Sequence, residues 1–109
     1  MADINFQNVF DTLKQGIVDL AKTTGAQYAT QAEADGQSFL DSSKADLQNW
    51  STQLVNGTLS KDDFTDLLQG QKDLFELTAL KQAGIAAIAL DTFKNGVFDL
   101  IEKTVFALI

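Results

Sequence analysis

The feature that most constrains the fold is a row of large side chains that recur every eleven residues in the first half of the chain. The row consists of Phe6, Ile17, Tyr28, Phe39 and Trp50. A neighbouring row at the same interval consists of Phe10, Ala21, Ala32, Ser43 and Leu54. Eleven residues make three turns of an α-helix at about 3.67 residues per turn, so each row stays on one side of a helix. The spacing therefore predicts an all-α protein.

The same interval continues in the second half, at Phe64, Phe75, Ala86, Val97 and Leu108. The chain has no proline, the residue that most strongly breaks helices. We predict two long helices, over about residues 3–56 and 60–108, each about 75–80 Å long at about 1.5 Å per residue. Gly25 and Gly36 are the places where the first helix would break. Because the rows keep their phase through both glycines, the pattern favours one continuous helix.

A single strong turn signal separates the two predicted helices. Gly57 suits the end of a helix, because glycine adopts positive φ without a Cβ penalty. Ser60 suits the start of the next helix, with Asp63 three residues later as a short capping box. These residues predict an antiparallel hairpin that pivots near residue 58 and places Trp50 near Phe64. Residues 1–109 then form a single α-helical hairpin domain.

The C-terminal third of the second predicted helix is apolar around most of its circumference. Its large apolar residues include Val97, Phe98, Ile101, Val105, Phe106, Leu108 and Ile109. One antiparallel partner cannot cover such a helix, and an exposed patch of that size is unusual on a soluble monomer. We therefore predict that these seven residues form an oligomer interface. A homodimeric four-helix bundle with two-fold symmetry is the leading arrangement, and a tetramer is the next.

Small residues are concentrated in the middle of both predicted helices. Residues 83–89 read Ala-Gly-Ile-Ala-Ala-Ile-Ala, opposite a stretch of the first helix that contains Gly25 and Gly36. Glycine inside a helix costs about 1 kcal/mol relative to alanine. We therefore expect several of the glycines to allow close approach of helix backbones.

The composition excludes several classes of function. Histidine, cysteine and arginine are absent, and the formal net charge is −7. Without histidine and cysteine, the chain cannot build a Ser-His-Asp triad, a Cys-His pair or a conventional zinc site. The lack of arginine and the negative charge argue against binding to nucleic acid or to an anionic membrane. We predict a non-enzymatic protein with no cofactor, no metal and no nucleic-acid partner.

We interpret three groups of charged residues as structural features and not as sites. An acidic cluster opens the second predicted helix and comprises Asp62, Asp63 and Asp66, where carboxylates favour the helix dipole. Glu33 and Asp35 before Gly36 resemble part of a calcium loop but lack its terminal glutamate, so we predict a solvated helix face. Lys81 and Lys94 lie among apolar residues, where lysine stems usually cover apolar surface while the ammonium stays in water.

The leading functional hypothesis is a structural or interaction protein that self-associates and whose main partner is a second copy of itself. The first residues contain no basic region followed by an apolar run, and no apolar stretch is long enough to span a membrane. We therefore predict a cytoplasmic protein without stable membrane insertion.

Two alternative functions rest on resemblance. The eleven-residue period and the Ala/Thr/Gln/Lys composition of residues 10–50 resemble dehydration-protective and apolipoprotein-like helices, which implies an amphipathic lipid- or acyl-chain-binding protein. The length, with Trp50 and Gly57 near the turn, is similar in shape to the small secreted helical hairpins of the WXG100 type. The sequence has Trp50-Ser-Thr in place of Trp-x-Gly, so the similarity does not extend to function.

Overall fold

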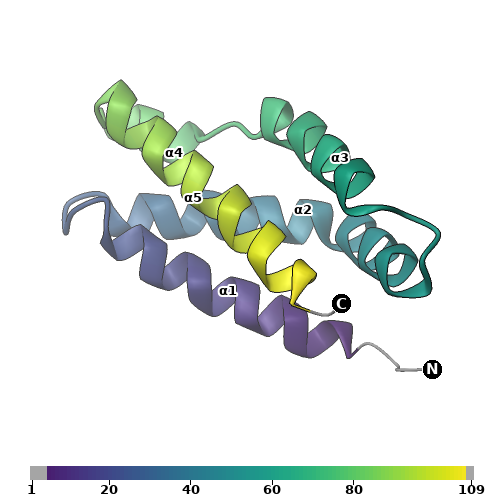
Figure 1. Ribbon diagram of the computed structural model, residues 1–109. Helices are drawn as coiled ribbons and strands as arrows, with labels where there is room; N and C mark the ends of the chain where they lie inside the picture. The colour runs from purple at the N-terminus through teal and green to yellow at the C-terminus, as the bar shows by residue number, and fades with distance from the viewer. Residues whose placement is uncertain (1–4, 108–109) are drawn as a thin grey trace.

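A computed structural model describes residues 5–107, and every regular element in that range is a helix. The elements are α1 (Phe6–Lys22), α2 (Ala29–Asn56), α3 (Lys61–Leu74), α4 (Thr78–Gln82) and α5 (Ala87–Phe106). The four longer helices alternate in direction, and the start of α1, the end of α5 and the α2–α3 turn lie at one end (Figure 1). The all-α class is confirmed, and one chain by itself forms a helical bundle.

The prediction of two unbroken helices is wrong, because the first predicted helix is divided in two. α1 ends at Lys22 and α2 begins at Ala29, so the 46 Å length of the molecule is well short of 75–80 Å. Of the two glycines flagged as possible breaks, Gly25 is the break, with a φ of 105°. The hydroxyls of Thr23 and Thr24 help to end α1 by donating to the carbonyls of Leu20 and Ala21, both at 2.6 Å.

The eleven-residue rows mark buried faces even though the helix is broken. Every residue of the second row, from Phe10 to Leu54, is buried. Within α1 and within α2, the residues of a row lie on one side of the helix. The break between the two helices falls between Ala21 and Ala32. Periodicity therefore identified the core-facing side but could not distinguish one long helix from two antiparallel ones.

The second predicted helix is broken twice, and the first of these breaks is held by tertiary packing. Residues 75–77 leave the helical conformation, and Phe75 and Leu77 are buried while Glu76 between them is exposed. The Phe75 ring lies 4.6 Å from that of Phe39 in α2 and 5.9 Å from that of Phe98 in α5. An extended segment points alternate side chains the same way, so both apolar residues reach the core.

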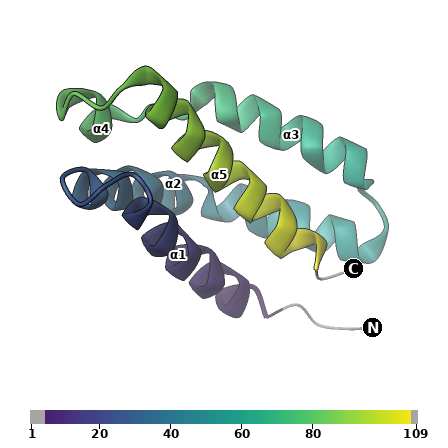
Figure 2. The same cartoon turned by 60° about the vertical axis from the view of Figure 1, so that its left-hand side comes forward.

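The second break follows α4 at Gly84, which has a φ of 83°. The Gly84 N–H donates to the carbonyl of Lys81, and the Ile85 N–H donates to that of Leu80. A glycine in this conformation commonly ends a helix. It turns the chain so that the N–H groups after the helix donate to carbonyls of the last turn that have no partner within the helix. Figure 2 shows the resulting reversal, which brings α5 back along the bundle.

The predicted turn at residues 57–60 is confirmed. Gly57 ends α2 with a φ of 80°, and the Thr58 N–H donates to the Gln53 carbonyl at 2.9 Å. The Ser60 hydroxyl accepts a hydrogen bond from the Asp63 N–H at 3.0 Å, so it caps α3. The pairing across this turn is also confirmed, because the rings of Trp50 and Phe64 lie 6.4 Å apart edge to face.

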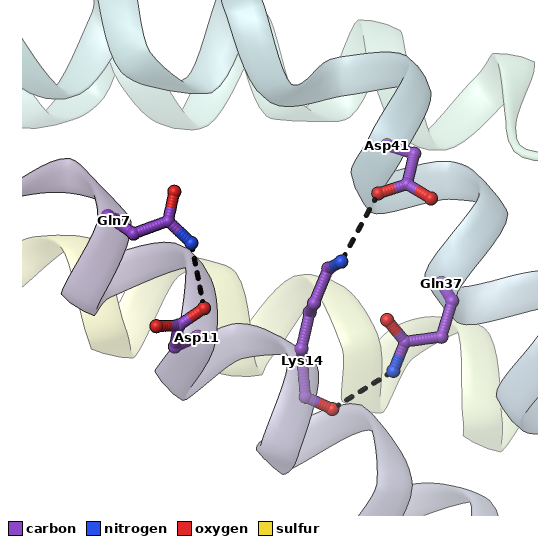
Figure 3. A network of polar contacts seen from close by, with 5 residues as sticks. All are labelled: Gln7, Asp11, Lys14, Gln37 and Asp41. Atoms are coloured by element: carbon purple, nitrogen blue, oxygen red, sulfur yellow. Dashed lines mark hydrogen bonds and ion pairs between the residues drawn. The ribbon is translucent and has the colours of Figure 1, made fainter.

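Polar contacts fix the register of α1 against α2. The Gln37 amide nitrogen donates to the Lys14 carbonyl at 3.2 Å, and the Lys14 ammonium lies 3.6 Å from the Asp41 carboxylate (Figure 3). Within α1, the Gln7 amide donates to the Asp11 carboxylate one turn later. The ion pair is largely exposed, so it adds little to stability but helps to define which residues face each other.

Two of the helical glycines allow close contacts between helices, but the predicted close approach of residues 83–89 is wrong, because nothing lies within 4 Å of a Cβ at Gly25 or Gly84. A Cβ at Gly36 in α2 would lie 2.5 Å from Cγ2 of Ile17 in α1. A Cβ at Gly16 in α1 would lie 2.6 Å from Cδ2 of Leu100 in α5. Both distances are shorter than van der Waals contact, so an alanine at either position would force the neighbouring side chain to move.

Candidate functional site

The predicted oligomer interface lies mainly inside the bundle. Val97, Phe98, Ile101 and Val105 are buried within the single chain. Phe106 is partly buried, and its ring lies 5.6 Å from that of Phe64 in α3. Leu108 and Ile109 lie outside the described residues.

This arrangement corrects the assignment of those residues to a contact between copies. A helix that is apolar on several sides needs several neighbours, and α5 finds them in α1, α2 and α3 of its own chain. The prediction counted one partner helix because it assumed two helices per chain. Self-association is a separate prediction, and any surface for it has to be found elsewhere.

Asp35 has a structural role that its sequence context does not reveal. Its side chain is buried in α2, and its two carboxylate oxygens accept hydrogen bonds from the N–H groups of Ala79 at 3.1 Å and Leu80 at 2.9 Å. These N–H groups open α4, where Leu77 provides no side-chain cap. Asp35 is therefore the cap of a short helix that begins more than forty residues later. The predicted solvated face is wrong for Asp35, whereas Glu33 is exposed.

Among the other charged candidates, the acidic residues lie at the start of α3, where the sequence places them. Asp62 and Asp63 occupy the first turn of α3 and are exposed. Lys81 is exposed and Lys94 is partly buried. Within residues 5–107, no group of three or more acidic, histidine or cysteine side chains has the geometry to hold a metal ion.

An uncharged surface with a mostly apolar hollow lies at the end of the bundle away from the 57–60 turn. Two segments meet there, residues 23–32 and 82–90, and neither contains a charged residue. We call this surface the Ile88 end. Ile88 is 83% exposed, the largest exposed fraction among the large hydrophobic residues of the described chain.

A hollow of about 440 Å³ lies beside Ile88, between the end of α1 and the start of α5. It is lined by Thr23, Thr24, Ala86, Ile88, Ala89, Thr92 and Phe93. The four charged residues that flank the two segments are two cations and two anions, Lys22, Glu33, Lys81 and Asp91. The Ile88 end is thus nearly neutral in a chain of net charge −7, and it combines a protruding apolar side chain with a mostly apolar hollow.

A second, more polar cleft of about 370 Å³ lies between α2 and the segment that joins α3 to α4. It is lined by Asp35, Ser38, Phe39, Ser42, Ser43, Gln71, Leu74, Phe75, Glu76 and Thr78. The two surfaces differ in chemistry, because this cleft contains two carboxylates and the hollow at the Ile88 end contains none.

Comparison of the chain with protein-family models, with curated proteins and with solved structures returns no match in any of the three. Among the described residues, no helix is both long enough and apolar enough to cross a membrane. The function therefore has to be argued from the two surfaces themselves.

Proposed function

We propose that this protein is a non-enzymatic interaction protein that self-associates through the Ile88 end. The observation that carries the proposal is Ile88 itself, which stands 83% exposed beside a mostly apolar hollow. In a two-fold contact the same patch meets itself, so a protruding side chain and an adjacent hollow on one copy can fit the hollow and side chain of the other. The proposed state is a homodimer in which the two copies meet at the Ile88 end and not through the C-terminal residues.

Electrostatics favour this surface over the rest of the molecule for a contact between identical copies. Two chains of net charge −7 repel each other, and the repulsion is weakest where neither copy places charge at the contact. The Ile88 end meets that condition, since segments 23–32 and 82–90 are uncharged and the flanking charges cancel. Salt screens the remaining repulsion, so association through this end should strengthen as ionic strength rises.

The decisive experiment is the absolute mass in solution, measured by light scattering on a sizing column. We expect wild type at twice the 11.9 kDa chain mass and Ile88→Asp at the monomer mass, with unchanged helical circular dichroism. Leu74→Asp is the matched control, because Leu74 is 74% exposed on α3 and does not line the hollow beside Ile88, and the substitution adds the same charge. A monomeric wild type, or equal effects of the two variants, would contradict the proposal.

The lipid-binding alternative uses the same surface but makes a different prediction. It expects a wild-type monomer that sediments with phosphatidylcholine vesicles, and loss of that sedimentation in Ile88→Asp. The similarity to WXG100 hairpins rests on chain length and on Trp50 and Gly57 near the turn, and it does not extend to function.

A further inference from the structure

One side of α3 carries an apolar stripe that the rest of the described chain leaves in contact with water. Two of the large hydrophobic residues that are exposed in residues 5–107 lie on this helix, Leu67 at 37% exposure and Leu74 at 74%. They are seven residues apart with Gly70 between them, a spacing that places all three on one side of a helix. We call these three residues the α3 stripe. None of them lines the hollow beside Ile88, so the stripe is a second, separate surface.

Gly70 has no packing role within the described chain. A Cβ at this position would meet no atom within 4 Å, whereas Gly16 and Gly36 allow close contacts between helices. Glycine inside a helix is destabilising relative to alanine, so the monomer gains nothing from it here. The distance between two packed helices depends on the size of the side chains at the contact. A glycine between two exposed leucines would therefore let a second helix approach α3 closely.

The charged side chains of α3 that border the stripe are negative. Asp62, Asp66 and Asp73 are exposed and follow one another at intervals of four and seven residues, so they form a line along one flank of the stripe. The two lysines of α3 lie on the opposite side of the helix, where the Lys61 ammonium is 5.3 Å from the centre of the Phe106 ring. This combination complements a helix that carries apolar residues on one face and cations beside them.

A second copy of α3 fits the stripe less well than a partner of opposite charge. Two identical helices that pack antiparallel about a two-fold axis bring the same flank of each helix together. Asp66 and Asp73 of one copy would then face the same two residues of the other copy. Like charges placed this close together are destabilising. The arrangement of charge therefore favours a basic partner helix.

We propose that the α3 stripe binds a basic amphipathic helix of another protein. The apolar side chains of that helix pack on Leu67 and Leu74, and its backbone passes closest to α3 at Gly70. Its lysine or arginine side chains face Asp66 and Asp73. Leu74 also borders the cleft between α2 and the α3–α4 connection, where one apolar side chain of the partner can insert. This interaction is independent of self-association through the Ile88 end.

The test uses a peptide as long as α3, 14 residues, that consists of two copies of Leu-Lys-Lys-Leu-Leu-Lys-Lys. Titration calorimetry measures its dissociation constant, and the backbone amide resonances locate the contact. We expect saturable binding, with the largest shifts in residues 67–74, and no binding of the same peptide with glutamate in place of lysine. Equal binding of the two peptides, or shifts concentrated in another helix, would overturn the proposal.

The dependence on salt separates this interaction from self-association. Added salt screens the attraction between the peptide and the carboxylates, so the peptide complex should weaken as ionic strength rises. Association through the Ile88 end should strengthen over the same range, because salt there screens a repulsion. Peptide binding that is unaffected by salt would contradict the role given to the acidic flank, whatever the mass of the protein in solution.

Two truncations of exposed apolar side chains test the position of the contact. Leu74→Ala should weaken peptide binding about ten-fold, because it removes an apolar anchor. Ile88→Ala removes a side chain of similar size that is 83% exposed on another surface, and peptide binding should be unchanged. Equal effects would reject the stripe as the site. A dimer that is lost in Leu74→Ala but kept in Ile88→Ala would assign the stripe to a second copy and overturn the proposal.

Two double variants of equal charge change separate a site from a general charge effect. Asp66→Asn with Asp73→Asn removes two carboxylates from the flank of the stripe, and we expect peptide binding to weaken about three-fold. Asp19→Asn with Asp91→Asn removes two exposed carboxylates from α1 and α5, and peptide binding should be nearly unchanged. Equal weakening by both double variants would show that the peptide responds to net charge alone, and the site would be rejected.

Discussion

The two ends of the bundle are built in different ways. At the Gly57 end, which we define as residues 47–60, the chain reverses with groups that are close in sequence. Gly57 supplies the positive φ, and the Thr58 N–H donates to Gln53. The next helix is capped by Ser60, which accepts from Asp63. Each of these contacts spans only a few residues, so the sequence alone was enough to predict the turn.

At the Ile88 end, local contacts, such as those of the Thr24 hydroxyl with Ala21 and of the Gly84 N–H with Lys81, are joined by a contact from far along the sequence. Tyr28 and Ala86 precede α2 and α5 at the N-cap positions, and neither side chain caps its helix. Nearby, α4 is capped by Asp35 from the opposite helix. Short-range signals specify a turn independently of the rest of the fold, whereas a long-range cap exists only once the helices have packed.

The surfaces of the two ends differ as well. Both are free of charge in sequence, but the exposed side chains of residues 47–60 are mainly amides and hydroxyls, such as Gln48, Thr52 and Asn56. At the Ile88 end, Thr23, Gln27, Thr30 and Gln82 are also exposed, but Ile88 and several alanines are exposed beside them. An uncharged run is therefore not by itself a contact surface, and the distinction depends on which of its side chains face water.

The largest expected effect comes from removing the long-range cap. Asp35→Ala leaves the N–H groups of Ala79 and Leu80 without their acceptor in a buried setting, and we expect a loss of about 2–3 kcal/mol in the free energy of unfolding. Urea denaturation measures the loss, and amide exchange at residues 79 and 80 should accelerate. Glu33→Ala is the control, because Glu33 is an exposed carboxylate on the same helix.

A smaller effect is expected where α1 and α2 approach each other. Gly36→Ala gains helix propensity but drives a Cβ into the buried Ile17, so we expect a net loss of about 1–2 kcal/mol. Gly70→Ala in α3 meets no atom within 4 Å and should stabilise the protein by about 0.5–1 kcal/mol. If thermal unfolding shows that both substitutions change the stability in the same direction, the close contact between Gly36 and Ile17 is rejected.

The local cap at the Gly57 end should matter less than the long-range one. Ser60→Ala removes the acceptor of the Asp63 N–H, and we expect a loss of about 1 kcal/mol, with Ser60→Asp close to wild type. Both values come from urea denaturation under the conditions used for Asp35→Ala. A loss larger than that of Asp35→Ala would reverse the comparison between the two ends.

The smallest effect is expected near the Gly57 end, where Ser51 of α2 is fully buried and its hydroxyl has no partner in the described chain. Ser51→Ala removes the unpaired group and improves helix propensity, so we expect a stability gain of about 0.5 kcal/mol on thermal unfolding. Thr52→Ala, at the exposed neighbouring position, is the reference substitution. A loss of stability in Ser51→Ala would show that the buried hydroxyl makes a hydrogen bond in solution.

The sequence by itself determined the helical class, the buried faces and the turn at residues 57–60. It did so because helical period and capping are local, as the burial of Phe10 and Leu54 and the Ser60 cap illustrate. It also excluded the chemistry of histidine and cysteine. The signal for the first break was present in Thr23-Thr24-Gly25, but the unbroken phase of the rows outweighed it in our interpretation.

Only the tertiary structure decided how many helices the chain forms and which of them cover each other. Phe75 and Leu77 leave the helix because the core holds both side chains, and Asp35 serves as a cap because packing brings α4 to it. The same packing buries Val97 and Ile101 and leaves Ile88 in water. A helical pattern records that a face is apolar, but whether that face meets its own chain or a partner depends on contacts between residues distant in sequence.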